Sequence, residues 1–318
     1  MGLTDEKIRI VVLEGGGRLD AALAHLLEDR GITRSALRRL MDDGRVRVNG
    51  RRPKPSESAS EGQLVEIELP AAPSGKPIAD RIPLDVLYED EDCLAVDKPA
   101  GMVTHPAAGH WEGTLVNALL GLDIPLSDGF QAGRPGIVHR LDKETSGIVL
   151  VAKNNAAQAF LSKQFKERSV QKVYKALLWG ALDQADSTVD GPIGRDPANR
   201  KRMKVTPGGR PSLTRFTVEE RLPQATLVRA VPHSGRTHQI RVHAAHLHHP
   251  VVGDVLYGGR REHGLRPGPL RRKLESLGRF LLHAHQLVFQ TQTGGRVTVT
   301  SPVPSVFSDL LEEFRGYE

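Results

Sequence analysis

The stretch IVHRLDKETSGIVLVAKN at residues 137–154 places one carboxylate, Asp142, between Leu141 and a strand predicted for residues 148–152. The strand is a short run of aliphatic and β-branched residues, which is typical of a strand buried inside a sheet. A turn is the simplest explanation of DKETSG, because Asp accepts local backbone hydrogen bonds and Gly147 permits unusual backbone angles. A reactive carboxylate is the alternative, and these residues by themselves leave both open.

Strands predicted on both sides of this stretch outnumber the predicted helices. The alternating or apolar runs that predict strands lie at residues 85–90, 93–99, 147–154, 172–180, 213–222, 225–232 and 296–302. Helical periodicity is found at residues 114–121, 157–168, 237–247 and 305–314. Because the two kinds of element do not alternate strictly, the pattern predicts an α+β fold with a large mixed, mainly antiparallel sheet.

A small α/β module is predicted over residues 18–69. Leucines recur there at helical spacing, a second helix is predicted over residues 32–44, and RVRVNG at 45–50 ends in the Asn-Gly pair that is typical of a hairpin. A further alternating strand follows at 64–69. The Pro-rich residues 70–83 are predicted to be a linker, and residues 84–318 to be a second domain.

The composition excludes several classes of protein. A single cysteine, Cys93, rules out an internal disulfide framework and fits a reducing compartment, so we expect a cytoplasmic protein. No apolar run approaches the ~20 residues of a membrane span. Aromatic residues make up 4% of the chain, which argues against a surface built on repeated base stacking.

Positive charge is concentrated in three segments, although the net charge of the chain is only +6. Residues 30–54 hold nine basic and two acidic side chains, a difference of +7, and Arg34, Arg38 and Arg45 lie among them. Residues 195–215 and 260–279 each hold seven basic side chains, against one and two acidic ones. A solvated surface explains any one of these segments, but three together favour a nucleic-acid partner.

Several strings resemble the motifs of one enzyme family. HRLDKETSG at residues 139–147 closely resembles the catalytic motif of the pseudouridine synthases of the RluA family. LAVDKPAGMVTHP at 94–106, KVYKAL at 172–177 and SGRTHQIRVHAAHLHHPVVGDVLYGG at 234–259 resemble its other motifs in the same order. The likeness covers about residues 84–318, and residues 17–50 resemble the S4-like RNA-binding domain of the branch that acts on large-subunit ribosomal RNA.

The resemblance implies that Asp142 is the essential carboxylate and that Tyr174 and Arg241 are the other catalytic residues. Pseudouridylation is an isomerisation that consumes no redox equivalent, phosphate or water, so we expect no cofactor. A carboxylate in a pocket with little water is costly to ionise unless a cation is near, and Arg241 is the expected partner. Taken alone, Tyr174 fits a core aromatic residue equally well, and Arg241 a surface cation.

RNA contacts are expected from further residues. The target base must be flipped out of folded RNA, and Arg140 is the candidate for filling the space that it leaves. His139 and Arg236 are additional candidates for RNA contact, with Arg34, Arg38 and Arg45 in the front module. The histidines of the string at residues 234–259 do not form a known zinc-ligand string, so no metal site is predicted.

The expected partner is ribosomal RNA of the large subunit or its precursor particle, and we expect a monomer. Two alternatives remain open: the same reaction on other ribosomal or transfer RNA uridines, and an RNA-binding assembly factor without activity. The sequence also leaves open whether the carboxylate attacks C1′, attacks C6 or removes the 2′ proton.

Overall fold

The computed structural model describes residues 6–12, 17–27, 34–54, 56–69, 77–106, 111–128, 134–199 and 201–317. Contacts within the chain define two compact units, residues 1–77 with 107–111 and residues 78–106 with 112–318. The domain limits of 18–69 and 84–318 stay predictions. Half of the predicted linker, residues 70–76, lies outside the described residues.

The smaller unit packs two helices against a three-stranded antiparallel sheet of order β1-β3-β2. Its core includes Leu19 and Leu23, one helical turn apart, and Ile67 from the central strand. β1 was not predicted, although it pairs with β3 along its whole length. The elements are β1 (Glu6–Val11), α1 (Leu19–Leu26), α2 (Arg34–Asp42), β2 (Val46–Val48) and β3 (Leu64–Leu69).

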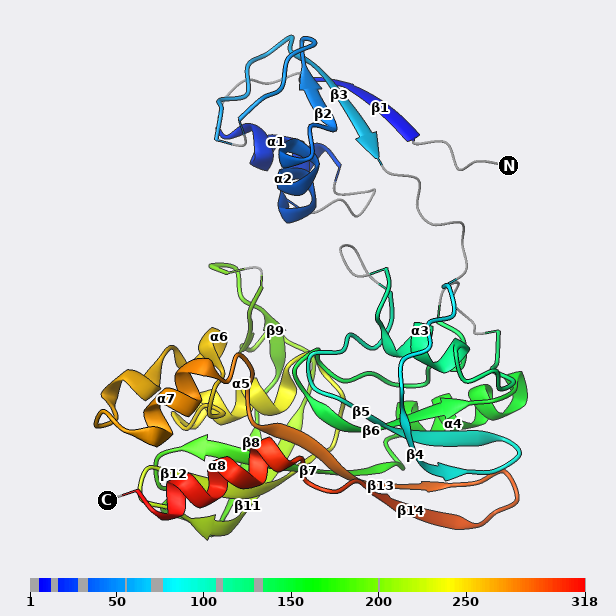
Figure 1. Cartoon of the computed structure of the whole chain (residues 1–318), viewed down its shortest axis with the longest axis vertical. Helices are drawn as coiled ribbons and strands as arrows, with labels where there is room; N and C mark the ends of the chain where they lie inside the picture. The colour runs from blue at the N-terminus through cyan, green and yellow to red at the C-terminus, as the bar shows by residue number, and fades with distance from the viewer. Residues whose placement is uncertain are drawn as a thin grey trace. The chain divides into compact units, whose positions relative to one another are not determined.

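The described residues of the larger unit form a nine-stranded sheet (Figure 1). Its order is β4-β5-β6-β13-β7-β12-β11-β8, with β14 beside β13, and every pairing is antiparallel except β6 with β13. The prediction of an α+β fold with a large mixed, mainly antiparallel sheet is confirmed. The strands are β4 (Asp85–Glu89), β5 (Cys93–Lys98), β6 (Ser146–Ala152), β7 (Gln171–Trp179), β8 (Asp186–Asp190), β11 (Leu213–Arg221), β12 (Ala225–Pro232), β13 (Leu282–Gln290) and β14 (Arg296–Thr300). A separate pair joins β9 (Ile193–Arg195) and β10 (Met203–Val205).

Helices cover both faces of this sheet. On β6, Ile148 and Leu150 pack on one side with α4, while Val149 and Val151 pack on the other with α3. On β7 the same alternation sends one set of side chains towards α8 and the other towards α5. Strands buried on both faces explain the continuous apolar run at residues 148–152. The helices are α3 (Leu115–Leu120), α4 (Asn155–Glu167), α5 (Gln239–His246), α6 (Val255–Gly258), α7 (Pro269–Ser276), α8 (Ser305–Arg315) and the short 3₁₀ helix η1 (Arg261–Gly264).

The junction of β6 and β13 requires the glycine of DKETSG. The two strands pair only at Ser146 with His283 and at Gly147 with Ala284. Gly147 has a φ of +111°, and a Cβ on it would lie 2.3 Å from the carbonyl oxygen of Ala284. A side chain cannot fit at that distance, so only glycine allows the two halves of the sheet to join here.

β13 is the main element that the sequence analysis missed. Its sequence, LHAHQLVFQ, contains His283 and His285, so it lacks the apolar alternation that predicts a strand, and its register with β7 shifts between Ala284 and Gln286. Both imidazoles bond to polar groups of the protein: Nδ1 of His283 lies 3.0 Å from the Ser146 hydroxyl, and Nδ1 of His285 lies 2.7 Å from the Ser301 carbonyl. Within the described ranges, no helix is both long and apolar enough to cross a membrane.

Candidate active site

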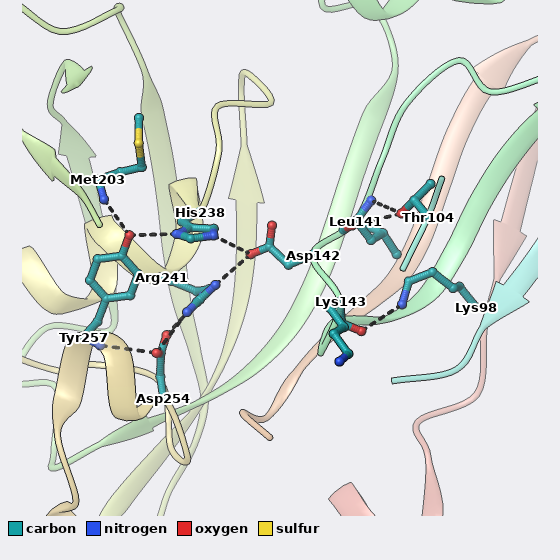
Figure 2. A network of polar contacts seen from close by, with 10 residues as sticks. All are labelled: Lys98, Thr104, Leu141, Asp142, Lys143, Met203, His238, Arg241, Asp254 and Tyr257. Carbon is teal, nitrogen blue, oxygen red and sulfur yellow. Dashed lines mark hydrogen bonds and ion pairs between the residues drawn. The ribbon is translucent and has the colours of Figure 1, made fainter. Parts of the chain in front are cut away.

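The loop that carries Asp142 is held through its main chain (Figure 2). The Thr104 hydroxyl donates to the carbonyl of Leu141 at 3.0 Å, on one side of Asp142. On the other side, the carbonyl of Lys143 accepts from Lys98 Nζ at 3.2 Å and from the Gly101 amide at 2.9 Å. All three donors belong to β5 or the loop after it, so the string at residues 94–106 holds the one at residues 139–147 in place.

Lys98 is a buried cation at the centre of this support. Its side chain is 0% exposed, and Nζ also donates to the carbonyls of Pro99 and Met102, each at 2.8 Å. Three acceptors match the three N–H bonds of an ammonium group. Burial lowers the pKa of Lys98 to about 7, although the charges of Glu144, Asp142 and Asp97 oppose that shift.

Two carboxylates hold Arg241 from opposite sides. Its Nε and Nη2 donate to the two carboxylate oxygens of Asp254, at 2.6 and 3.0 Å. Its Nη1 donates to Oδ2 of Asp142 at 3.0 Å. Arg241 is 6% exposed, and its guanidinium lies 4.2 Å from the centre of the Phe280 ring. Burial lowers its pKa, but the hydrogen bonds and charges of the two aspartates outweigh that effect and raise it.

This geometry rules out the interpretation of Arg241 as a surface cation. The expected ion pair with Asp142 is present, and the side chain of Asp142 is 21% exposed, so the carboxylate is partly open to the site. A forked pair such as Arg241–Asp254 fixes the plane of the guanidinium, which then presents a single N–H to the second carboxylate.

His238 also lies close to Asp142. Its Nε2 is 3.9 Å from Oδ2 of Asp142, and its Nδ1 is 2.8 Å from the hydroxyl of Tyr257. That hydroxyl accepts from the Met203 amide at 2.9 Å, which leaves its own hydrogen for Nδ1 of His238. Burial lowers the pKa of His238, and a neutral ring in this tautomer carries its hydrogen on Nε2, facing Asp142.

Tyr174 lies on β7 and lines the cavity into which Asp142 opens, a space of about 100 Å³. Arg140, Arg236, His238 and Arg241 line the same cavity. Burial, and secondarily the charge of Asp142, raises the pKa of Tyr174 above its usual value, so the phenol is neutral. The structure thus brings the three predicted catalytic residues to one cavity.

The RNA-contact residues predicted in the larger unit are Arg140, Arg236 and His139. Arg140 is exposed and lines the cavity, as does Arg236, whose Nε lies 3.4 Å from the carbonyl of Pro211. His139 stacks on Phe165, and its Nε2 accepts the Leu150 amide at 2.9 Å, so it supports β6. Its contact with RNA stays a prediction.

Three predicted RNA-contact residues belong to the smaller unit. Arg38 is exposed on α2 and Arg45 is half-buried before β2. Arg34 begins α2, and its side chain lies outside what the structure describes. Their role as a phosphate-binding surface stays a prediction.

Lys98, His238 and Asp254 were missed as site residues. Each lies inside one of the strings that resemble the family motifs. Its importance comes from a contact in the folded chain, which the spacing of residues in the sequence does not indicate. Asp254 is 13 residues from Arg241, in the turn that leads into α6, where its side chain also accepts the Tyr257 amide. An acidic residue between VVG and VLY was the one available signal.

Histidines do not gather into a metal site in the part of the chain that the structure describes. No group of three or more His, Cys, Asp or Glu side chains there is arranged to hold a metal ion. His243, for example, is fully buried and contacts the Thr214 hydroxyl at 2.8 Å and the Gly191 carbonyl at 2.9 Å. The expectation of a reaction without metal stays a prediction.

Known proteins resemble this chain in sequence and in fold. Residues 92–246 match the family model described as RNA pseudouridylate synthase. The chain is 40% identical to the ribosomal large subunit pseudouridine synthase D of Pseudomonas aeruginosa, over 95% of this chain and 93% of that protein. It is 39% identical to the uncharacterized RNA pseudouridine synthase YlyB of Bacillus subtilis, over 94% of each.

A solved structure agrees with this match. Human RNA pseudouridylate synthase domain containing 1 covers 75% of this chain and 97% of its own, with a TM-score of 0.56 and 28% identity. Asp142, Tyr174 and Arg241 all lie inside residues 92–246. The chain therefore belongs to the RluA family and is an RNA pseudouridine synthase.

Proposed function

We propose that this enzyme converts specific uridines of large-subunit ribosomal RNA to pseudouridine, with Asp142 as the essential carboxylate and without a cofactor. One observation carries the assignment of the site: Asp254 fixes Arg241, and Arg241 holds Asp142 at 3.0 Å in the cavity that Tyr174 lines. The choice of RNA rests on the relatives named for the ribosomal large subunit, such as those from Pseudomonas aeruginosa and Neisseria meningitidis.

The chemistry needs an ionised carboxylate beside the ribose and the base. The bond from C1′ to N1 breaks, the base turns, and C5 joins C1′, so atoms and charge balance within the nucleotide. Arg241 keeps its positive charge at any working pH, so the Asp142 carboxylate always has a cation beside it. The arrangement serves each of three first steps: attack on C1′, attack on C6, or removal of the 2′ proton.

Tyr174 has the position for two tasks on the base. Its ring can stack on uracil, and its hydroxyl, neutral because the pKa is raised, can take part in the transfer of the C5 proton. Arg140 enters the space that the flipped uridine leaves, and Arg236 and His139 contact the strand on either side.

The front module, residues 18–69, supplies binding rather than chemistry. Its S4-like sequence and its basic residues Arg34, Arg38 and Arg45 support contact with phosphates of structured RNA. We place the reaction in the cytoplasm, on ribosomal RNA or its precursor particle, with the enzyme acting as a monomer.

Mapping of pseudouridines in total RNA tests the proposal. Cells that lack the protein should lose one or a few pseudouridines from large-subunit ribosomal RNA, and an Asp142→Asn copy should not restore them. Loss of sites from transfer RNA or from other ribosomal RNA would reassign the substrate. An unchanged map would favour an assembly factor without activity.

A further inference from the structure

A second cavity of about 320 Å³ shares Arg140 with the first. Its walls include His105 from the loop after β5, Arg134 from the segment before Asp142, and Gln158 and Ser162 from α4. None of these four residues takes part in the hydrogen bonds around Asp142. The cavity therefore needs an explanation of its own.

His105 has an unsatisfied polar atom. The residue is 5% exposed, and its Nδ1 has no hydrogen-bond partner among the residues that the structure describes. A buried polar atom left in this state costs about 1–3 kcal/mol, and native proteins keep few of them without a reason. Burial, and then the charges of Arg134 and Arg140, lowers the pKa of His105 to about 4. The ring is therefore neutral and offers one donor and one acceptor.

The cavity also has a clear electrostatic character. Arg134 and Arg140 line it, and none of the described residues that form its walls carries a carboxylate. The Gln158 amide is already bonded to Ser127 and to the Ile137 carbonyl. Two guanidinium groups favour a phosphate, while a neutral imidazole favours a polar group without charge. A nucleotide combines both kinds of group.

We propose that this cavity is a second RNA subsite, which holds a nucleotide next to the target uridine, with its phosphate at Arg134 and a polar edge of its base at His105. The proposal rests on the proposed function, since it assumes an RNA strand in the first cavity. Neighbouring nucleotides share a phosphate, and Arg140 lines both cavities, so a strand that enters one passes directly to the other. The subsite would let the enzyme read the sequence beside its target.

Binding measurements can test the subsite apart from catalysis. The probe is an RNA hairpin carrying a mapped target uridine, with each flanking nucleotide in turn replaced by an abasic one. In an Asp142→Asn background, one abasic position should weaken binding about 10-fold, the size expected for loss of one base contact. His105→Leu should weaken binding of the intact hairpin by a similar factor, and the abasic change at that position should then add nothing.

Controls separate a base contact from a general loss of structure. His105→Asn, whose amide replaces Nδ1, should recover most of the affinity, and His263→Leu, at an exposed histidine of η1, should change nothing. In the enzyme with Asp142 intact, His105→Leu should raise KM and leave kcat within about twofold, as for a residue that contributes to binding alone. If His105→Leu does not fold, Arg134→Gln serves in its place and should lower the salt slope of log K by about one phosphate contact.

Two results would overturn the subsite. One is that the loss of affinity from His105→Leu adds to the loss from the abasic change at every flanking position. The other is that His105→Leu binds all hairpins as tightly as its parent. Either result leaves the proposed function intact. Pseudouridine formation by Asp142→Asn would instead overturn the proposed function, whatever the binding pattern.

Discussion

The two sides of the active site are held by different kinds of contact. On the side of Asp142, neutral carbonyls of Leu141 and Lys143 accept hydrogen bonds, so the loop keeps its shape whatever its side chains are. On the side of Arg241, a charged pair with Asp254 sets the position of the reactive group directly. The carboxylate is thus placed by main-chain geometry, and the guanidinium by a matched charge.

This difference separates folding from activity. A substitution of the Asp142 side chain removes no support from its loop, whereas a substitution near Arg241 leaves a buried charge without its partner. We therefore expect the two sides to respond differently to mutation and to pH.

The largest effect is expected for Asp142→Asn. The amide keeps the shape of the side chain and loses its charge, so pseudouridine formation should fall about 10⁴-fold or more. The melting temperature and RNA affinity should stay close to those of the parent, because the loop is held through its main chain. Turnover of a target hairpin, with thermal melting as the control, checks this. Substantial activity in the variant would contradict the assignment of Asp142.

Arg241→Met tests the other side. It leaves Asp142 and Asp254 without their shared cation, at a cost of about 3–5 kcal/mol divided between stability and activity. Denaturant unfolding and single-turnover rates measured together give that sum. A variant that folds and reacts like its parent would show that the cavity is not the active site.

Asp254→Asn should be milder and sharpens the comparison. Asn keeps the shape of Asp254 and loses one charge-assisted contact with Arg241. The activation free energy that corresponds to kcat should therefore rise by about 1.5–3 kcal/mol, while KM changes little. Asp254→Glu should not rescue activity fully, because the longer side chain shifts the guanidinium. A residue that only positions Arg241 should lower kcat and leave KM unchanged. A rise in KM as large as the fall in kcat would instead indicate that Asp254 contacts RNA directly.

Lys98→Met probes the main-chain side. The carbonyls of Pro99 and Met102 lose the Nζ donor, while the Lys143 carbonyl keeps the Gly101 amide. The change also removes a buried cation, so we expect a net loss of about 1–3 kcal/mol in unfolding free energy. Lys166→Met, at an exposed lysine of α4, is the matched control and should be neutral. Denaturant midpoints compare the two. No difference between them would mean that Lys98 does not support the loop.

The last prediction concerns pH, and it is a slope of the unfolding free energy and not a single step. The pKa of Lys98 is lowered to about 7 in the folded chain and is near 10.4 in an unfolded one. Between these values the unfolded chain binds more protons, so the unfolding free energy should rise with pH, by at most about 1.4 kcal/mol per pH unit. Lys98→Met should lose this slope, while Arg241→Met should keep it. Unfolding curves from pH 7 to 10 for the three proteins decide it, and equal slopes would contradict the lowered pKa.

The sequence predicted the architecture where periodicity was strong. The apolar run at residues 148–152 identified β6, and the helical pattern at 237–247 identified α5. β13 escaped because its two histidines break the alternation, and their burial depends on Ser146 and Ser301, which are distant in sequence.

The site was predicted in part for a similar reason. The resemblance to family motifs marked Asp142, Tyr174 and Arg241, and the structure brings them to one cavity. It did not mark Asp254 or Lys98, because the value of either residue lies in what it touches. Asp254 pairs with Arg241, 13 residues away, and Lys98 bonds to a main-chain carbonyl 45 residues away. Neither contact produces a periodic pattern in the sequence.

The close approach of β6 to β13 at Gly147 has a mechanical consequence. Only two residue pairs join the strands there, and Asp142 enters from the β6 half, while Arg241 belongs to the helix that packs on β7 and β12. The ion pair therefore spans the narrowest joint of the sheet. Any change in the angle between the two halves of the sheet would therefore change the 3.0 Å distance between Arg241 Nη1 and Asp142 Oδ2. That distance reports how far the two halves have moved apart.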